Sequence, residues 1–462
     1  MSGLPKGWAC TTLGEVIELK YGKALPDRVR SGAGFPVFGS NGIVGYHKPA
    51  LTTGETIIVG RKGSVGEVNF SKIPCSPIDT TYFVDKFPSK NPRYWYFKLR
   101  QLNLGKLNKS TAIPGFNRGD AYGLMIMMPP VAEQKRIADK LDTMLAQIDT
   151  CRKRLTSAQS TLERFRQSVL VSAISGNLTC DWRIKYPQTP VDVNSVVEEL
   201  FFDRITAGNF GKIDHRTYKI TKEEENVVIT NNCAWPMVRI GSICACIVPN
   251  RNKPKSFSGN FHWLLTQHFD DNKIFINYEN VKNGLTEDEV REFSAKIIPV
   301  NGVVMTCIGR LGLSAVLDEA AVINQQLHAF LPNKYVLPEF LAYAIRANKK
   351  YYDENSTSTT VSYLNKTACN SLPIPLPKID EQRELIRRVE TLFAFADRLE
   401  ARLATACTAV DRLTPALLAK AFRGELVPQD PADEPASELL ARLATSRAAE
   451  TAKPRRARTA KD

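Results

Sequence analysis

The chain has 462 residues, which is too long for a single hydrophobic core, and its 43% hydrophobic content is typical of globular proteins. The formal net charge of +14 favours a polyanionic partner, with nucleic acid ahead of an acidic membrane. No apolar run is long enough to span a bilayer and the first residues do not resemble a signal peptide, so we expect a cytoplasmic protein with no membrane partner.

Residues 1–128 are predicted to form a mixed α/β block. Residues 56–59 and 80–84 are rich in β-branched and aromatic side chains, which favours strands. A helix is expected from Pro92, and the many glycines between the strands indicate turns. The order of the strands does not follow from the sequence.

Residues 129–176 are predicted to form a long helix. From Ile137 onward, apolar residues recur in alternating steps of four and three, which is the heptad pattern of a coiled coil. Pro130 precedes the helix and Gly176 follows it, as is usual at helix starts and ends. At 1.5 Å per residue, such a helix spans on the order of 65 Å.

Residues 177–233 form a connector, in which residues 194–205 have a helical pattern and residues 222–225 form a charged turn. A second mixed α/β block is predicted over residues 234–374. Its strand at residues 303–306 and its helix around residues 335–343 correspond to elements of the first block.

A second long helix is predicted over residues 375–424. We expect Pro415 to kink this helix or to end a helical segment near Leu413. The residues predicted to pair the two long helices are Ile137, Leu141, Ile148, Leu155 and Leu162 on the first, and Leu385, Val389, Leu392, Leu399, Leu403 and Val410 on the second. Residues 425–462 are expected to contain a short helix at residues 436–444 and a basic, disordered tail.

The two halves of the chain repeat each other. The heptad pattern and the flanking residues recur 248 residues further along, so that Pro-x-x-x-Glu-Gln precedes each helix and Gly-x-Leu follows it. Trp8 corresponds to Trp235, and Asn117 corresponds to Asn365. We align residues 60–63 with residues 309–312, which matches Lys62 to Leu311. The predicted fold class is therefore α+β, with two similar blocks separated by two long helices.

Sequence signatures of catalysis are absent. There is no Gly-x-x-x-x-Gly-Lys-Ser/Thr loop for nucleotide hydrolysis and no Asn/Asp-Pro-Pro-aromatic motif of amino-methyltransferases. Cys244 and Cys246 form the only close pair among ten cysteines, without a second pair to complete a zinc site. We predict neither catalytic residues nor a metal site in this chain.

Basic and amide side chains in predicted loops are the candidates for DNA contact. Arg and Lys read guanine edges, Asn reads adenine edges, and all three hold phosphates. For any single residue a solvated surface charge is the commoner explanation, so the two clusters matter more than their members. The predicted DNA-binding residues are Lys20, Lys23, Asn41, Arg61, Lys62 and Lys109 in the first block, and Asn250, Arg251, Lys253, Lys255 and Arg310 in the second. Tyr21, Lys106 and Asn108 are weaker candidates.

Two blocks on a rigid spacer suit a long polymer. Major-groove sites on one face of DNA lie about 34 Å apart. An antiparallel pair of long helices could hold two readers at a fixed separation, so that the spacing of the two sites would become part of the sequence that is read.

This arrangement resembles the specificity subunit of type I restriction–modification enzymes. The resemblance covers nearly the whole chain and is strongest in the helices. It is also strong in three motifs, Phe-Gly-Ser-Asn-Gly at residues 38–42, Ile-Asn-Gln-Gln-Leu at residues 323–327 and Gly-Glu-Leu-Val-Pro-Gln-Asp-Pro at residues 424–431. It is weaker inside the blocks, which vary within that family.

The resemblance implies a function. Each block would be a target-recognition domain that reads half of a split site on double-stranded DNA. The helices would pair antiparallel and dock two methyltransferase subunits. S-adenosylmethionine, ATP and Mg would bind partner subunits, including motor-nuclease subunits, and no cofactor would bind this chain.

Two other hypotheses remain open. The chain could be a divergent nuclease or methyltransferase, in which case it would be active without partners. It could instead be a coiled-coil adaptor without DNA recognition, in which case it would lack a salt-dependent, sequence-preferring affinity for DNA.

Overall fold

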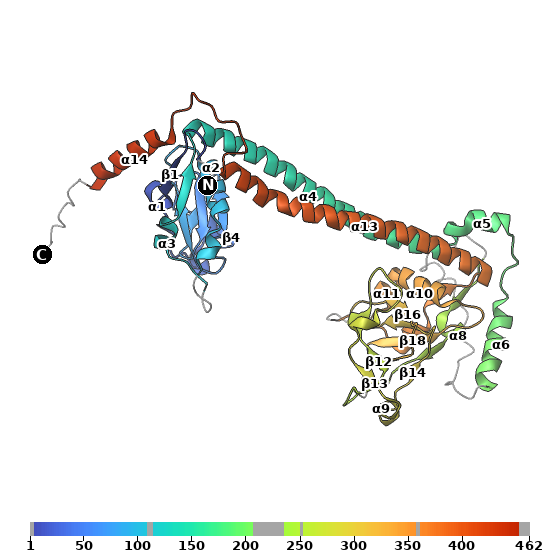
Figure 1. Ribbon diagram of the computed structural model, residues 1–462. Helices are drawn as coiled ribbons and strands as arrows, with labels where there is room; N and C mark the ends of the chain where they lie inside the picture. Colours follow the sequence, from blue (N-terminus) through green and yellow to red (C-terminus); the bar gives the residue numbers. More distant parts are fainter. Residues whose placement is uncertain (1–3, 109–113, 207–234, 250–252, 357–360, 452–462) are drawn as a thin grey trace. The chain divides into compact units, whose positions relative to one another are not determined.

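The computed structural model describes residues 4–108, 114–206, 235–249, 253–356 and 361–451. It contains two compact units (Figure 1). Unit 1 consists of residues 1–156 and 404–462, and unit 2 consists of residues 157–403. Each unit therefore holds one block together with one half of each long helix, whereas the sequence analysis treated the helices as separate segments.

Unit 1 contains the first block. Its elements are β1 (Ala9–Thr12), α1 (Leu13–Val16), β2 (Lys20–Tyr21), η1 (Asp27–Val29), β3 (Phe35–Gly39), β4 (Gly42–His47), β5 (Thr56–Gly60), β6 (Val68–Ser71), β7 (Ser76–Pro77), β8 (Thr81–Val84), α2 (Pro92–Leu102), η2 (Leu104–Leu107), α3 (Arg118–Tyr122), β9 (Met125–Met128) and the C-terminal α14 (Ala436–Thr451). The strands predicted at residues 56–59 and 80–84 and the helix predicted from Pro92 are confirmed.

Three small sheets build this block. Their strand orders are β2-β8-β5-β6, β4-β3-β7 and β1-β9. Helix α2 begins at Pro92, where the Asn91 side chain accepts a hydrogen bond from the Tyr94 amide. Trp95 and Phe97 of α2 are buried in the same core as Ile57 of β5. Burial of such side chains stabilises the block by roughly 1.5–3 kcal/mol each.

Unit 2 contains the second block. Its elements are η3 (Asn177–Thr179), α5 (Cys180–Lys185), α6 (Val193–Thr206), β10 (Met237–Arg239), α8 (Ile240–Ile243), β11 (Ala245–Ile247), β12 (Phe261–Leu264), η5 (Thr266–His268), η6 (Tyr278–Asn280), β13 (Gly284–Leu285), α9 (Glu287–Glu292), β14 (Ile297–Ile298), β15 (Val303–Thr306), β16 (Ser314–Val316), β17 (Ala321–Ile323), β18 (Leu327–Leu331), α10 (Pro338–Ala347), α11 (Lys349–Asn355), α12 (Lys366–Asn370) and β19 (Pro373–Pro375).

The second block repeats the topology of the first and adds one strand, β14, to its second sheet. Its sheet orders are β11-β18-β15-β16, β13-β12-β17-β14 and β10-β19. In each block the first sheet is antiparallel, and one parallel pair, β3 with β7 or β12 with β17, lies in the second sheet. The internal repeat predicted from the sequence therefore includes the order of the strands, which could not be predicted from the sequence.

Two long helices, α4 (Val131–Ile174) and α13 (Ile379–Phe422), run through both units. In unit 1 the start of α4 shares a core with the end of α13, where Ile137 and Leu141 pack in one cluster with Leu418 and Phe422. In unit 2 the end of α4 and the start of α13 meet in the same way, with Val169 and Leu385 in one cluster. The helices therefore pair antiparallel. Helix α4 begins and ends two residues inside its predicted limits, and α13 begins four residues and ends two residues inside its predicted limits.

The residues predicted to pair the helices are all buried or half-buried. Ile137, Leu141, Ile148, Leu385 and Val389 are at most 5% exposed. The remaining residues are half-buried, namely Leu155, Leu162, Leu392, Leu399, Leu403 and Val410. The most deeply buried ones also contact the cores of the blocks, so the helix seam and the block cores are continuous at both ends.

Helix α13 does not end near Leu413. It continues through Pro415 to Phe422, contrary to one of the two expected effects of that proline. A proline inside a helix removes one backbone hydrogen bond and costs about 3 kcal/mol. Leu418, Ala421 and Phe422 are buried beyond it, and their burial offsets this cost.

The repeat also extends past the long helices. After α4, helix α6 packs on α8 of the second block, and after α13, helix α14 packs on α1 of the first block. Buried or packed residues on α14 include Ala436 and Leu439, and those on α6 include Val196 and Leu200. Helix α14 reaches Thr451, so the disorder expected from residue 445 onward is wrong up to that point; Arg447 donates to the Gly14 carbonyl at 2.8 Å.

The charged turn expected at residues 222–225 and the tail from residue 452 lie outside the described residues. Within the part of the chain that is described, no helix is both long and apolar enough to cross a membrane.

Candidate nucleic-acid interface

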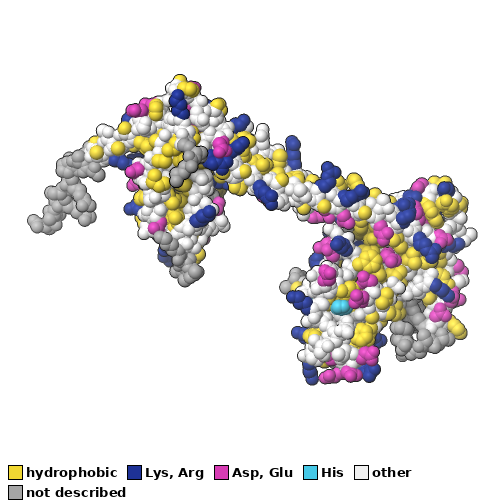
Figure 2. Space-filling model, in the orientation of Figure 1, with side chains coloured by type: hydrophobic (Ala, Val, Ile, Leu, Met, Phe, Trp, Pro, Cys, Tyr) yellow, Lys and Arg dark blue, Asp and Glu magenta, His cyan; other side chains and the backbone are white. Residues whose placement is uncertain are grey.

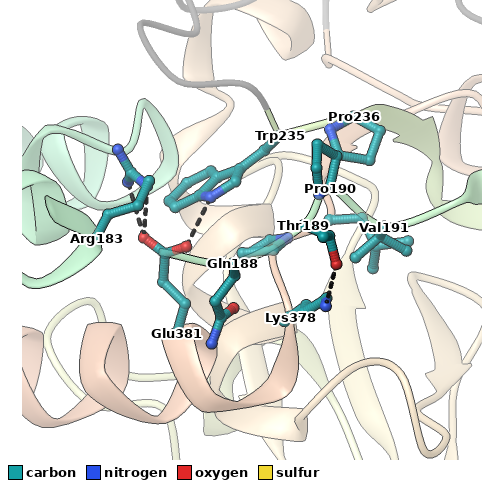
Figure 3. A pocket seen from close by; sticks show the side chains of 11 residues that line it. Arg183, Gln188, Thr189, Pro190, Val191, Trp235, Pro236, Lys378 and Glu381 are labelled. Atoms are coloured by element: carbon teal, nitrogen blue, oxygen red, sulfur yellow. Dashed lines mark hydrogen bonds and ion pairs between the residues drawn. The ribbon is translucent and has the colours of Figure 1, made fainter. Parts of the chain in front are cut away.

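A buried glutamate joins the second block to its long helix (Figure 3). Glu381 lies in the first turn of α13 and is 2% exposed. Its Oε2 accepts from Trp235 Nε1 at 2.8 Å, and its Oε1 accepts from Thr179 Oγ1 at 2.8 Å and from Arg183 Nε at 2.9 Å. The Arg183 guanidinium also lies over the Trp235 ring.

The first block is joined to α4 in the same way. Glu133 is fully buried and accepts from Trp8 Nε1 at 3.0 Å. Its second oxygen accepts from Gln429 Nε2 at 3.5 Å, and no arginine of the described residues bonds Glu133 as Arg183 bonds Glu381. Burial raises the pKa of Glu133, against the hydrogen bond from Trp8, which lowers it.

The glutamines that follow these glutamates hydrogen-bond to the backbone just before each helix. Gln134 Nε2 donates to the Pro129 carbonyl at 2.9 Å, and Gln382 Nε2 donates to the Pro377 carbonyl at 2.8 Å. The Pro-x-x-x-Glu-Gln motif is therefore a structural joint that fixes each block on its helix. The small pocket beside it, drawn in Figure 3, lies against this joint.

A shallow hollow with basic and aromatic walls lies at one edge of the first block. It is lined by Tyr21, Arg61, Lys62, Tyr82, Gly115, Phe116 and Asn117. The edge is formed where β2 and β5 end and β8 begins, and a bridge between Lys62 and Gly115 closes it. This site unites Arg61 and Lys62, two of the predicted DNA-binding residues, with the weaker candidate Tyr21.

The other candidates of the first block lie in different settings. Lys20 pairs with Asp85 at 2.6 Å, which offsets its charge. Lys23 and Asn41 are exposed. Asn41 follows Ser40, whose side chain lies close to Gly60 and Gly63, so the β3–β4 turn belongs to the same edge as the hollow. Lys106 and Asn108 are exposed, Asn108 accepts from the Gly115 amide at 3.0 Å, and Lys109 lies outside the described residues.

The predicted alignment of the two glycine-rich turns is wrong. Gly63 and Gly66 have positive φ of 75° and 76°, and the glycines with the matching values are Gly309 and Gly312. The amide of Gly66 donates to the carbonyl of Gly60, and that of Gly312 donates to the carbonyl of Thr306. Lys62 therefore corresponds to Ile308 and not to Leu311. The side chains of the two turns differ, so the alignment rests on their matching backbone conformations.

Arg310 lies in a different environment from Arg61. It pairs with Asp271 at 2.9 Å and donates to the Phe269 carbonyl at 3.2 Å. The hollow around it is also lined by Arg346, Lys349 and Asp353. Burial lowers the pKa of Arg346 to about 10, and its guanidinium is engaged by backbone carbonyls.

The basic loop of the second block lies beside acidic residues. Lys253 and Lys255 are exposed, but Ser256 and Ser258 of the same loop donate to Glu289 on α9. That helix also carries Glu287, Asp288 and Glu292, and acidic side chains gather over it in Figure 2. This acidity weakens the case for Lys253 and Lys255 as phosphate contacts; Asn250 and Arg251 lie outside the described residues.

Comparison with known proteins explains this architecture. The family model described as the type I restriction modification DNA specificity domain matches residues 5–159 and 232–406. The chain belongs to this family.

Several specificity subunits are similar to this chain. It is 26% identical to the type I restriction enzyme EcoDI specificity subunit of Escherichia coli, over 96% of each chain. It is 32% identical to the EcoKI specificity subunit of Escherichia coli K12, over 70% of this chain and 64% of that protein. A chain from a solved structure on complex assembly and conformational transition of the type I R-M system covers 92% of this chain, with 18% identity and a TM-score of 0.62, and shares its fold.

The two matched segments of this specificity subunit follow the structural repeat. Each begins just before a joint tryptophan, Trp8 or Trp235, and ends inside a long helix. Sequence reasoning missed the burial of Glu133 and Glu381, although the repeated Glu-Gln motif at the head of each helix was a signal for it. It also missed Arg118, because the folded block is what brings its guanidinium carbon to 5.2 Å from the Tyr21 ring centroid.

Proposed function

We propose that this specificity subunit reads a bipartite site on double-stranded DNA, one half with each block, and holds methyltransferase subunits in place. The observation that carries the proposal is that two blocks of one topology, fixed by the same joint, have different side chains at corresponding edges. Tyr21 and Arg61 of the first block correspond to Val248 and Cys307 of the second, when the β11–β18 register is extended by one residue. A shared scaffold with unlike edges suits the reading of two different sequences.

The affinity for DNA would come mainly from charge. The chain carries +14, and on the face drawn in Figure 2 the Lys and Arg side chains are spread over both blocks and along the helices. Contacts with phosphates hold a protein on DNA without reading its sequence, and base edges supply the choice of site.

The repeat also indicates how partners bind. Because α4 and α13 are of equal length and begin and end alike, the chain offers similar helix surfaces twice. Two copies of one partner could therefore dock, and two methyltransferase subunits fit that requirement. Motor-nuclease subunits would join the same complex.

The reaction would be carried out by the partners. S-adenosylmethionine would bind the methyltransferase subunits, and ATP and Mg the motor-nuclease subunits, in the cytoplasm where the DNA is found. This chain would supply the choice of sequence and the assembly, and no catalytic group.

The test is to assay the purified chain alone and together with methyltransferase subunits. We expect DNA methylation only in the mixture, at a bipartite sequence, and an affinity that falls steeply with salt. Methyl transfer or DNA cleavage by the chain alone would show that it is an enzyme. Complex formation without any preference for a DNA sequence would favour the coiled-coil adaptor.

A further inference from the structure

The hollow of the first block holds a cluster of tilted aromatic rings, and two arginines lie near one of them, Tyr21. The ring centroids of Tyr21 and Tyr82 are 5.0 Å apart, and those of Tyr82 and Phe116 are 5.3 Å apart in an edge-on arrangement. The guanidinium carbons of Arg61 and Arg118 lie 5.4 Å and 5.2 Å from the centroid of Tyr21. Tyr21 is 50% exposed, so the ring cluster is open to solvent on that side.

Arg61 is held in a fixed orientation without losing its charge. Its Nε and Nη2 donate to the Asp79 carbonyl at 3.2 Å and 2.7 Å, and its guanidinium also lies 5.8 Å from the Tyr82 ring. The partner is a backbone oxygen, and no carboxylate of the described residues forms an ion pair with Arg61. A guanidinium has five N–H donors, and the edge formed by Nη1 and the second hydrogen of Nη2 remains for a ligand.

That edge suits one part of DNA in particular. A planar guanidinium fork matches the O6 and N7 atoms of guanine in the major groove, which is the commonest specific contact of arginine with DNA. A phosphate would accept the same fork, but a phosphate contact needs no such immobilisation, and Lys62 on the rim is exposed and available for it.

We infer that Arg61 reads a guanine in the half-site bound by the first block. Tyr21 and Arg118 act as positioning residues for Arg61, and Lys62 contacts the DNA backbone. This inference rests on the proposed function, since it assigns a base to one of the two blocks.

The corresponding described positions of the second block hold other residues. Arg61 and Lys62 correspond there to Cys307 and Ile308, as the backbone bonds of the two turns show. Cys307 is fully buried. The guanine contact should therefore affect one half of the recognised site and leave the other unchanged.

The test uses the complete complex with methyltransferase subunits and sequences the sites that it methylates. With Arg61→Gln, we expect one guanine position in one half-site to accept other bases, with a loss of discrimination there of about tenfold to a hundredfold. Tyr21→Leu should relax the same position to a smaller extent. Lys62→Ala is the matched control, and it should weaken binding to all sequences alike and reduce the salt dependence by about one phosphate contact.

Two outcomes would overturn the inference. Arg61→Gln could keep the wild-type motif and weaken all sites evenly, which would make Arg61 a phosphate contact, or it could relax positions in both halves. Thermal unfolding of each variant shows whether the block is intact, and Arg61→Lys, which keeps the charge but loses the fork, should behave like Arg61→Gln in specificity. Exchange of the whole first block separates failure of the Arg61 inference from failure of the proposed function. If that exchange leaves the methylated motif unchanged, the proposed function itself is contradicted.

Discussion

At the residue scale, the two joint glutamates show how one motif is stabilised in two ways. Glu381 accepts hydrogen bonds from Trp235, Thr179 and Arg183, and so its charge is compensated. Glu133 is fully buried with Trp8 as its close donor, and burial raises its pKa. Loss of the glutamate charge should therefore change the stability of the two units by different amounts.

We predict that Glu381→Gln lowers the free energy of unfolding of its unit by about 2–4 kcal/mol, because Arg183 loses its counter-charge in a partly buried site. The matched change, Glu133→Gln, should cost less than about 1 kcal/mol, since an amide oxygen still accepts from Trp8. Urea unfolding followed by tryptophan fluorescence measures both. Equal losses in the two variants would contradict this account of the joints.

A buried lysine supplies a second prediction. Lys98 of α2 is 3% exposed and lies 4.6 Å from the Phe422 ring, and burial lowers its pKa to about 8. The unfolded chain keeps the ordinary value near 10.5, so the cost of burying the charge is complete below pH 8 and disappears as the pH rises toward 10.5.

Lys98→Met should therefore stabilise unit 1 by about 2 kcal/mol at pH 7, after allowance for the lost contact with Phe422. The gain should vanish by pH 10.5, and exposed Lys140→Met should change little at any pH. Thermal unfolding as a function of pH tests this. A gain for Lys98→Met that is the same at pH 7 and pH 10.5 would show that the charge is not its cause.

The residues that could be found from the sequence are those whose role follows from their type. Arg61 and Lys62 were predicted as DNA contacts from charge and loop position, and the structure places both in one hollow. Arg310 was predicted on the same grounds, but it pairs with Asp271, which lies far from it in the sequence. Such neutralisation depends on tertiary contacts and leaves no local signal.

At the element scale, the long helices were the most predictable part because their heptads and flanking Pro and Gly residues are local signals. Their pairing is reinforced by Arg166, whose side chain is 7% exposed. It bonds Asp397 and Glu400 of α13 and lies over the Phe393 ring. The short strands were found only in part, because pairs such as β7 with β3 are long-range and two residues long.

We predict that the double change Asp397→Asn with Glu400→Gln destabilises unit 2 by about 2–4 kcal/mol, since it leaves the buried Arg166 charge unpaired. The matched control is Asp411→Asn, which breaks the exposed pair with Arg152 in unit 1 and should cost less than about 1 kcal/mol. Urea unfolding compares the two. A larger effect of the exposed pair would mean that Arg166 does not hold the helices together.

At the scale of the whole molecule, the repeat is more complete than its sequence indicated. Helix α6 follows α4 and packs on α8 of the second block, and helix α14 follows α13 and packs on α1 of the first block, although α6 and α14 share little sequence. The two blocks share a strand order although their interiors diverge, because the topology depends on backbone pairing and not on particular side chains.

Removal of one heptad from α4 alone should disturb the pairing of α4 with α13. The deletion shifts one helix by about 10.5 Å against the other and takes half of its seam out of register. We expect a greater loss of DNA affinity than any single change of a surface charge produces. Titration of the complex with its DNA site measures the loss, and an unchanged affinity would show that the helix pair does not set the recognition geometry.

The central claim is that each block reads its own half of a split DNA site. The most direct measurement is to replace residues 1–128 with the corresponding block of another family member and to sequence the methylated sites in cells that also contain the methyltransferase subunits. We predict that one half of the methylated motif changes while the other half stays the same. A change in both halves, or in neither, would contradict the claim.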